Sequence, residues 1–570
     1  MRSKYLWHWP AAVAACIVIA LSLGPSTRWV LVEHLRLQTG TSGYMQSLLA
    51  HLGVSQLPDG STPRSGRSYS DALRRAAMRH PADPGSRIVL ATLNAGSEGA
   101  GLGSRTSRGL REAARAMPDS PEIWAAILRY DAMGSVWLGR DKEVSTLSPP
   151  SARYWNAGDR SSPEQLAAFV VAAEAGCRAD PGNGYLHAMR AVGLFAQRKD
   201  ADALAAMNAS ARSRAWADFT WVETDARLRL DREAFGRHGA FSEMTLSAAT
   251  LYPHLALLRG MARIAIAKAV QAEEGGRRSE GLAIRHDLMS LAALLRAEAR
   301  TGLDAMVSAA MARMAVVRPG GAAAPDAGAN GARPNARQLE AEYLRYLGSI
   351  GRSDEAEWAR RQFSAARDAV SIFSEGLPRS PLLSPPSRLL LARWQLGLAL
   401  MAIGLWCIAI AAASSLLART RGRVWPVAVV VSLGVLLGAW MTLTQAANAR
   451  LFPVYALVLS DLSGSGSATG PETAAIVLMQ AVVPGAIAAT VVIIGLAALT
   501  VGLVARKPFV QALSGITRWA AVVCVVAMAP LVVDTARREA ALSATLADCR
   551  PNECAFFARA VGRAWPVREP

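Results

Sequence analysis

Long stretches without charged side chains near both ends are the feature that most restricts how this chain can fold. Beyond residue 390, three long segments contain no Asp, Glu, Lys or Arg, namely 395–418, 424–449 and 473–505. A helix that crosses a bilayer needs about 20 predominantly apolar residues, so each of these segments is long enough. The shorter apolar run at 519–533 reaches that length with its flanking residues, which predicts a fourth C-terminal span.

A further apolar segment lies at 5–24, behind a short basic start. It predicts an uncleaved membrane anchor; a cleaved signal peptide is the alternative, although no small-residue cleavage site follows. Residues 473–505 are too long for one helix across a hydrocarbon core of about 30 Å. Pro484 followed by Gly485 predicts a break, with the span beginning near the glycine. Five spans are therefore predicted in total.

Basic residues in the short loops predict the orientation of these spans, because loops rich in Arg and Lys stay on the cytoplasmic side. The loop at 450–472 carries one basic residue, whereas the loops on either side each carry three. The two basic loops should therefore be cytoplasmic, and counting back through the spans puts the N-terminus inside and residues 27–387 outside. The residues on which this topology depends are Arg419, Arg421, Arg423, Arg506, Lys507 and Arg518.

The C-terminal tail falls outside in the same scheme, and it holds two cysteines in the sequence CRPNEC. An oxidising compartment permits a disulfide between Cys549 and Cys554, whereas a metal site would need two further ligands. The helical spacing of Phe557, Val561 and Ala564, with arginines beside them, predicts an amphipathic helix on the outer leaflet.

The net charge of +18 raises the question of nucleic-acid binding. Only 5 of the 62 basic residues are lysines, so arginine provides the other 57. Such a skew is typical of a GC-rich coding sequence, and scattered arginines are typical of solvated helix faces. A nucleic-acid surface would instead need a dense basic run interleaved with aromatic residues. We therefore predict no nucleic-acid partner.

The region between the membrane segments reads as helices joined by short polar breaks. Apolar residues recur at helical spacing, as in PHLALLRGMARIAIAKAV from Pro253, and period-two alternation is scarce. At three junctions an alanine-rich helix stops at a proline with an aspartate beside it. Proline suits the first turn of the next helix, and Asp or Asn can cap its free N–H groups. The pattern predicts an all-α fold.

Two segments of this region resemble tetratricopeptide-type helical repeats. AVGLFAQRKDADALAAMNASA at 191–211 and YLRYLGSIGRSDEAEWARRQFSAA at 343–366 are similar to that family's unit of helix, tight turn and helix. In the second segment, Gly351, Arg352 and Asp354 occupy the positions of the family's turn. The resemblance, taken over residues 71–370, implies a solenoid of stacked helix pairs that binds peptides or other proteins.

The predicted fold class is thus an all-α, helical-repeat domain between one N-terminal and four C-terminal transmembrane helices. The predicted order of parts is an N-terminal anchor at 1–26, an extracytoplasmic helical-repeat domain at 27–317, a flexible linker at 318–336, a final helical hairpin with a Pro/Ser stalk at 337–387, a four-helix transmembrane domain at 388–536 and an extracytoplasmic tail at 537–570.

Motifs that would indicate chemistry are missing from the sequence. H-E-x-x-H, C-x-x-C and G-x-S-x-G do not occur, and the eight histidines are scattered singly. Glu273 and Glu274, beside GGRR, read as a solvated turn. In WADFTW, the rings of Trp216, Phe219 and Trp221 could line a partner groove; packing between helices is the alternative. We therefore predict no enzyme activity, no cofactor and no metal.

These observations predict a multi-pass protein of a bacterial inner membrane, with its large helical domain on the periplasmic side. It would act as a scaffold or assembly factor that binds a protein or peptide. An accessory component of a polysaccharide or lipid export system is one alternative. A membrane-surface enzyme that uses Arg388, Arg393 or Asp461 is another. The identity of the partner does not follow from the sequence.

Overall fold

The structure is a computed structural model, and its described residues are helical, which confirms the all-α part of the predicted fold class. No β-strand occurs among the described residues, where an isolated bridge pairs Asn183 with Ala215. The described residues are 9–38, 69–95, 102–133, 136–144, 161–235, 239–240, 243, 252–321, 335–379, 385–419, 497, 500, 503–504 and 509–567.

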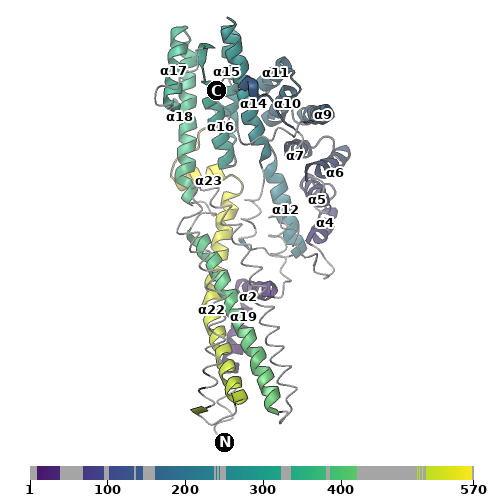
Figure 1. Cartoon of the computed structure of the whole chain (residues 1–570), viewed down its shortest axis with the longest axis vertical. Helices are drawn as coiled ribbons and strands as arrows, with labels where there is room; N and C mark the ends of the chain where they lie inside the picture. The colour runs from purple at the N-terminus through teal and green to yellow at the C-terminus, as the bar shows by residue number, and fades with distance from the viewer. Residues whose placement is uncertain are drawn as a thin grey trace. The chain divides into compact units, whose positions relative to one another are not determined.

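The chain forms two compact units that alternate along the sequence; their elements are labelled in Figure 1. The predicted boundary at residue 387 lies close to the change of unit after Ser380. The segments of the first unit are Met1–Ser61, Gly239–Met244 and Pro381–Thr545, and those of the second unit are Thr62–His238, Thr245–Ser380 and Leu546–Pro570.

The second unit consists of helices that mostly pack against their neighbours in sequence. In order these are α4 (Tyr69–Met78), α5 (Pro84–Ala95), α6 (Leu102–Ala116), α7 (Pro121–Asp131), α8 (Asp141–Val144), α9 (Pro163–Ala179), α10 (Gly184–Ala196), α11 (Asp200–Ala211), α12 (Thr220–Phe235), α14 (Pro253–Glu274), α15 (Arg278–Ala297), α16 (Gly302–Ala315), η2 (Pro319–Gly321), α17 (Ala336–Ser349), α18 (Ser353–Gly376), η3 (Leu377–Arg379) and α23 (Glu553–Ala560).

Consecutive α-helices of this unit contact each other in three runs: α4 to α7, α9 to α11, and α14 to α18. Helix α12 turns back onto α4 and α5, and α11 packs on α15. Such packing is what stacked helix pairs require, but a regular repeat of tetratricopeptide type stays a prediction.

The helices of the second unit begin where the sequence supplies caps. Before α9, the hydroxyl of Ser162 accepts the N–H of Gln165 at 3.2 Å, and the Gln165 side chain accepts the N–H of Ser162 at 3.0 Å. This reciprocal pair is a capping box. Asn335 and Gln338 form the same pair before α17.

Proline opens α5 and α7 at two of the three predicted junctions. At the third, α10 begins at Gly184, after Pro181, and Asn183 caps it. Helices α9 and α14 also begin at a proline.

The prediction that Glu273 lies in a solvated turn is wrong. Glu273 lies at the end of α14 with its side chain fully buried, and its carboxylate forms a bidentate pair with Arg285 of α15 at 2.7 and 3.0 Å. The Arg285 guanidinium also donates to the carbonyls of Ala315, Val317 and Arg318 at 2.7–2.9 Å. The pair therefore satisfies free carbonyls just beyond α16. Its arginine comes from the next helix, which local spacing does not reveal.

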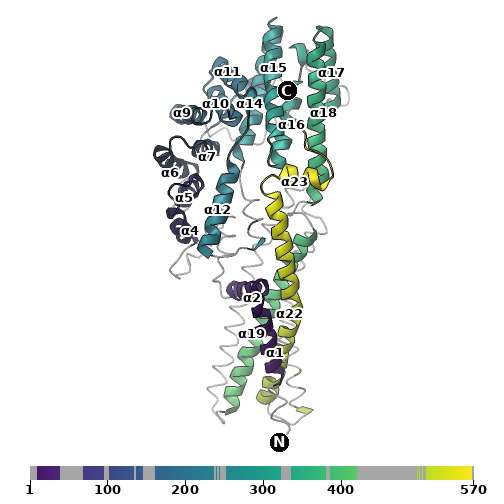
Figure 2. The ribbon, with the colours of Figure 1, turned by 180° about the vertical axis from the view of Figure 1, so that it is seen from behind.

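The first unit contains α1 (Trp9–Leu23), α2 (Pro25–Gln38), α19 (Pro385–Arg419) and most of α22 (Phe509–Cys549). Helix α2 packs on α19, and buried Cys407 and Ala521 join α19 to α22; Figure 2 shows these helices from behind. Trp394 donates from its indole nitrogen to Glu539 at 2.8 Å and stacks on His34 with ring centroids 4.3 Å apart.

Within the described part of the chain, one helix is long and apolar enough to cross a membrane, Ala512–Cys549. Ala14–Leu23 and Pro25–Leu35 pass the same test of length and composition only as a pair, bent by 116°. Ile403–Ala412, inside the predicted span 395–418, is a shorter apolar helix. The described residues thus hold one candidate span, or two, where the sequence predicts five for the whole chain.

The remaining predicted spans, 424–449 and most of 473–505, lie outside the described residues. The same holds for four of the predicted topology residues, namely Arg421, Arg423, Arg506 and Lys507. Of the other two, Arg419 ends α19 and Arg518 is exposed on α22. The orientation of the spans therefore stays a prediction.

The C-terminal segment packs within the second unit, which corrects the expected surface helix. α23 ends at Ala560, and Phe557 is fully buried against Phe373 and Gly376 of α18. Its apolar face is therefore covered by protein rather than by lipid. Cys549 and Cys554 are both buried free cysteines here, with the Cys554 thiol 3.2 Å from the carbonyl of Thr301. Their disulfide stays a prediction.

Candidate functional site

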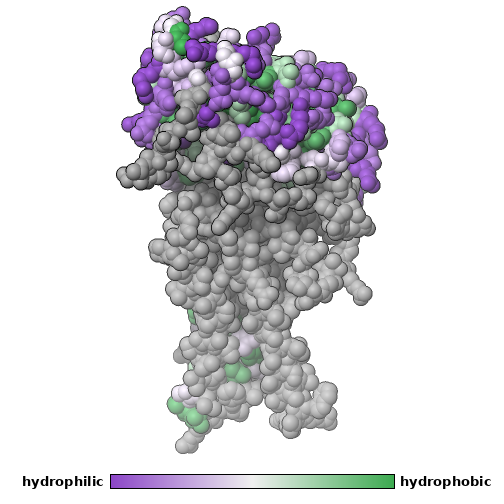
Figure 3. Space-filling model, turned by 45° about the horizontal axis from the view of Figure 1, so that its top comes forward, coloured by the Kyte–Doolittle hydropathy of each residue, from purple (hydrophilic) through white to green (hydrophobic). Residues whose placement is uncertain are grey.

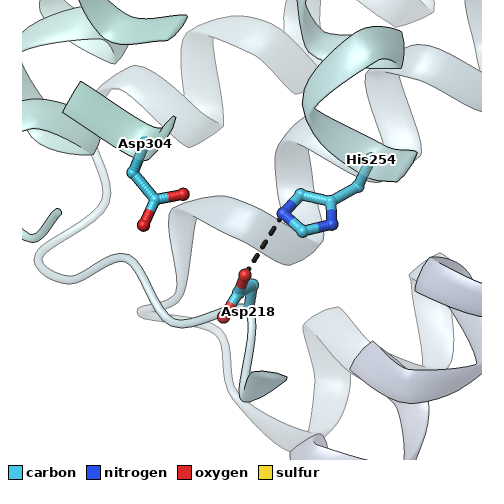
Figure 4. Close-up of side chains that lie close together, drawn as sticks. All are labelled: Asp218, His254 and Asp304. Carbon is cyan, nitrogen blue, oxygen red and sulfur yellow. Dashed lines mark ion pairs between the residues drawn. The ribbon is translucent and has the colours of Figure 1, made fainter. Parts of the chain in front are cut away.

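Three polar side chains from distant parts of the sequence converge inside the second unit (Figure 4). They are Asp218, His254 and Asp304, and each offers a ligand atom within 4.8 Å of the other two. Asp218 lies just before α12, His254 is the second residue of α14, and Asp304 is the third residue of α16. Three helix N-termini therefore meet at one buried point.

Helix capping fixes the two carboxylates. Asp218 accepts the backbone N–H of Thr220 at 3.0 Å and its hydroxyl at 2.9 Å. Asp304 accepts the backbone N–H of Thr301 at 3.1 Å and its hydroxyl at 2.9 Å, and both contacts use Oδ2. In each case the carboxylate holds the start of a helix. These contacts leave Oδ1 of Asp304 free to interact elsewhere.

The imidazole of His254 is fully buried. Its Nε2 lies 3.2 Å from Oδ2 of Asp218, at ion-pair distance but without the directionality of a hydrogen bond. Tyr185 and Tyr252 surround the ring, edge-on, with centroids at 5.4 and 6.0 Å. This aromatic wall fixes the ring where its nitrogen faces the carboxylates.

Three atoms of the cluster lack a hydrogen-bond partner although they are buried. They are Oδ1 of Asp304, whose residue is 6 % exposed, and both ring nitrogens of His254. Figure 4 shows one carboxylate oxygen of Asp304 directed toward the imidazole. A buried polar atom without a partner costs about 1–3 kcal/mol, so this cluster is costly unless something else binds it.

A second layer of charge lies beside Asp218. Arg129, which is nearly fully buried, donates to the Thr220 hydroxyl at 3.0 Å and to the Asp218 carbonyl at 3.4 Å. It also forms a short ion pair with Glu223, whose other oxygen accepts the Tyr130 hydroxyl at 2.7 Å. Burial raises the pKa of Glu223, but Arg129 and Arg227 outweigh it and leave that pKa below its usual value. Arg129 is thus already neutralised.

The two aspartates differ in electrostatics although they lie close together. Burial would raise the pKa of Asp218, but contact with His254, the Thr220 N–H and Arg129 outweighs it, so the pKa is lowered. Burial and the neighbouring charge of Asp218 raise the pKa of Asp304 to about 6. Asp218 is therefore ionised at neutral pH, whereas Asp304 keeps its proton to a higher pH than an ordinary aspartate does.

Asp304 predicts a stability that depends on pH. Its folded-state pKa of about 6 lies above the ordinary value of 3.8. The folded state therefore binds more protons between these values, and the free energy of unfolding falls as the pH rises from about 4 to above 6. We expect this loss to be on the order of 1–3 kcal/mol. Asp304→Asn should abolish it, as measured by denaturant unfolding in EDTA at pH 4.5 and 7.

Other groups titrate over the same pH range. The informative quantity is therefore the difference between the unaltered protein and Asp304→Asn in how much the free energy of unfolding changes with pH. Asparagine keeps the oxygen that accepts from Thr301, so the variant retains the cap of α16. Equal changes of stability with pH in both proteins would show that Asp304 does not carry a raised pKa.

The three predicted partner residues differ in burial, and the groove that they would line stays a prediction. Trp216 is buried, with its ring edge-on to Tyr185 at 5.7 Å. Phe219 is half-buried, with a φ of 55° just before α12. Trp221 is 39 % exposed, and the guanidinium of Arg300 lies 4.7 Å from its ring centroid. Trp216 therefore belongs to the core, whereas Trp221 faces solvent.

Sequence reasoning missed the cluster because its members are 36 and 50 residues apart and follow no metal-binding spacing. Each looks ordinary in its own context: Asp218 and Asp304 as caps, His254 as a lone histidine beside a proline. A partial signal was present at His254, which follows Pro253 at a helix start, whereas no proline stands beside Asp218 or Asp304.

Comparison of the chain with known proteins found no matching family model, no matching curated protein and no matching solved structure. The fold and the site together define a class only: an all-α protein with a candidate membrane-spanning helix and a buried Asp–His–Asp cluster in a separate helical unit.

Proposed function

We propose that this protein is a membrane-anchored adaptor whose second unit binds another protein outside the cytoplasm. The observation that carries the proposal is the division of the chain into two units. One contains most of the candidate span Ala512–Cys549, and the other is built from helices that pack on their sequence neighbours. Helical stacks of that kind commonly expose surfaces for proteins or peptides.

A small apolar surface beside the candidate site supports this proposal. Trp221 is 39 % exposed, and on α16 Leu303 and Met306 are 46 % and 42 % exposed. Arg300, which contacts the Trp221 ring, directly precedes that helix. Exposed Trp and Arg with apolar neighbours are typical of residues that dominate binding energy in protein interfaces.

Most of the surrounding surface is different in character. In the view of Figure 3, the described surface of the second unit is largely hydrophilic, with small hydrophobic patches. We infer a partner segment with apolar side chains, which would contact Trp221, and with a carboxylate, which would pair with Arg300.

Site-specific photocrosslinking in intact spheroplasts tests this function. A benzophenone amino acid at position 221 should give a discrete adduct with one protein, because the ring at this position would lie within the interface. The control position is Val171 on α9, which is 61 % exposed and outside this surface. The adduct is identified by mass spectrometry and should contain an apolar and acidic segment at the crosslink.

Protease added to the same spheroplasts tests whether the second unit lies outside the cytoplasm. The adduct and residues 69–376 should be digested without lysis, since the arginine pattern of the loops favours an external second unit. Equal adducts from positions 171 and 221, or none from either, would contradict the adaptor. Digestion only after lysis would contradict the proposed location. The adaptor function would still be tested by whether position 221 gives an adduct that position 171 does not.

A further inference from the structure

The Asp218, His254 and Asp304 side chains have the donor types that a divalent transition metal selects. An imidazole nitrogen with two carboxylate oxygens suits Zn²⁺ and related ions, whose ligands are drawn from His, Asp, Glu and Cys. Mg²⁺ prefers six oxygen ligands and keeps several waters. The donor set therefore points to a cation that accepts nitrogen.

The geometry of the cluster is close to that of a metal site. Ligands bound to Zn²⁺ at about 2.0–2.2 Å in a tetrahedron lie about 3.5 Å from one another. The three candidate ligand atoms are all within 4.8 Å, and Asp218 Oδ2 and His254 Nε2 are already 3.2 Å apart. Only Asp304 would have to move inward, by about 1 Å, which is a small side-chain rotation.

The hydrogen bonds around the cluster are those of an outer layer rather than of a closed network. The Thr220 N–H and the Thr301 groups donate to the outer oxygens of the two carboxylates, and the Thr220 hydroxyl donates to Oδ2 of Asp218, the oxygen that faces His254. Asp304 Oδ1 and both ring nitrogens of His254 have no hydrogen-bond partner. The two carboxylates are thus oriented by partners that would not contact the ion, as is typical of metal-binding side chains.

Proton rearrangement is the alternative way to satisfy these atoms. A protonated Asp304 could donate to Nε2 of a neutral His254, and an ionised Asp304 could accept from a protonated His254. Neither hydrogen bond is formed in this structure, where both atoms are without a partner. A divalent cation would instead bind all three inward-facing atoms, and its charge would balance two carboxylates.

Two features oppose a cation, and both are compensated. Arg129 places a positive charge beside Asp218, but Glu223 pairs with it. The three helix N-termini carry partial positive charge, but at α12 and α16 their N–H groups already donate to the outer carboxylate oxygens. The inward-facing oxygens therefore keep their negative potential.

We propose that Asp218, His254 and Asp304 form a binding site for a divalent transition-metal cation, with Zn²⁺ as the representative ion. Three protein ligands leave a fourth position of the tetrahedron for water. The site joins the starts of α12, α14 and α16, so a bound ion would hold together segments that are far apart in sequence. This inference does not depend on the adaptor function.

The test uses the full chain, purified in detergent without a histidine tag and stripped with EDTA. Titration with ZnCl2 should show one ion bound per chain, with a higher melting temperature in the loaded protein. Mg²⁺ should bind at least about 100-fold more weakly, since it accepts imidazole nitrogen poorly. Bound zinc is counted by elemental mass spectrometry after gel filtration.

Asp304→Asn should lower the Zn²⁺ affinity by at least about 100-fold, which exceeds the 10–100-fold typical of losing an outer partner. The matched control is Asp287→Asn on α15, a half-buried aspartate that accepts from Asn208 at 2.9 Å and lies outside the cluster. It should bind zinc like the unaltered protein. His254→Gln provides a second variant if Asp304→Asn does not melt cooperatively.

Three results would overturn the site. They are the lack of stoichiometric zinc in the unaltered protein, unchanged affinity in whichever variant folds, and equal loss in the Asp287→Asn control. A rise in melting temperature that survives in the cluster variants would assign the zinc to another place. Because no step involves a partner protein, failure of the adaptor experiment leaves this result unaffected.

Discussion

Replacing Arg285 with Met should lower the free energy of unfolding by about 3–5 kcal/mol, because it leaves Glu273 as a buried charge without a partner. The carboxylate has no exposed surface, and three backbone carbonyls beyond α16 lose their donor in the same variant. Arginine provides all five donors at once, so no apolar side chain can replace it there. Denaturant unfolding followed by tryptophan fluorescence measures the change.

The matched control is Arg277→Met, which removes an exposed pair with Glu280 at the start of the same helix. Exposed pairs contribute about 0–1 kcal/mol, so this variant should differ little from the unaltered protein. Glu273→Met combined with Arg285→Met should be less destabilised than the sum of the two single variants. A loss below about 1 kcal/mol for Arg285→Met would show that water or another group replaces the guanidinium.

Gly281→Ala is expected to destabilise the second unit by about 1–3 kcal/mol, the usual cost of forcing an extra methyl group into a packed core. A Cβ at this position would lie 2.4 Å from Glu273 Cγ and 2.8 Å from the Ala269 carbonyl oxygen. Neither neighbour can yield easily: one is backbone of α14, and the other is held by Arg285. The melting temperature of the full chain reports the loss.

Gly348→Ala is the matched control, since no atom lies within 4 Å of the corresponding Cβ on α17. There the change should stabilise the helix by about 0.5–1 kcal/mol, because alanine loses less backbone entropy than glycine. Opposite signs for the two variants are the expected result. Loss of stability in both would mean that the close approach of α14 and α15 is not the cause.

The all-α class and many helix starts could be predicted from the sequence, because apolar spacing and capping act over a few residues. Pro121, Pro163 and Pro253 open their helices as the local rules require. Those rules do not say which helices pack together. They could not predict that α12 turns back onto α4 and α5. The same limit explains the tail: an apolar face at Phe557 indicates burial, but not whether lipid or α18 covers it.

The candidate site could not be predicted for a related reason. The cluster forms only because three helix starts meet in the fold, and these bring Asp218, His254 and Asp304 together. The sequence pattern within a single helix does not predict where that helix will pack. Burial of Glu273 is a similar case, since GGRR beside it indicates solvent. Membrane segments are predicted by a different quantity, total apolar length. The predicted span 395–418 lies within the continuous helix α19, in which Ile403–Ala412 is a shorter apolar helix among the described residues.

The alternation of the two units along the chain has a consequence for synthesis and for engineering. Thr62–His238, Thr245–Ser380 and Leu546–Pro570 together make one compact body, so its last part leaves the ribosome only when translation is nearly finished. Glu553 in that part accepts from the N–H of Gly302 at 2.8 Å, at the start of α16. A stop codon anywhere before it would leave this body without its closing piece, and no single continuous fragment could be cut out to represent it.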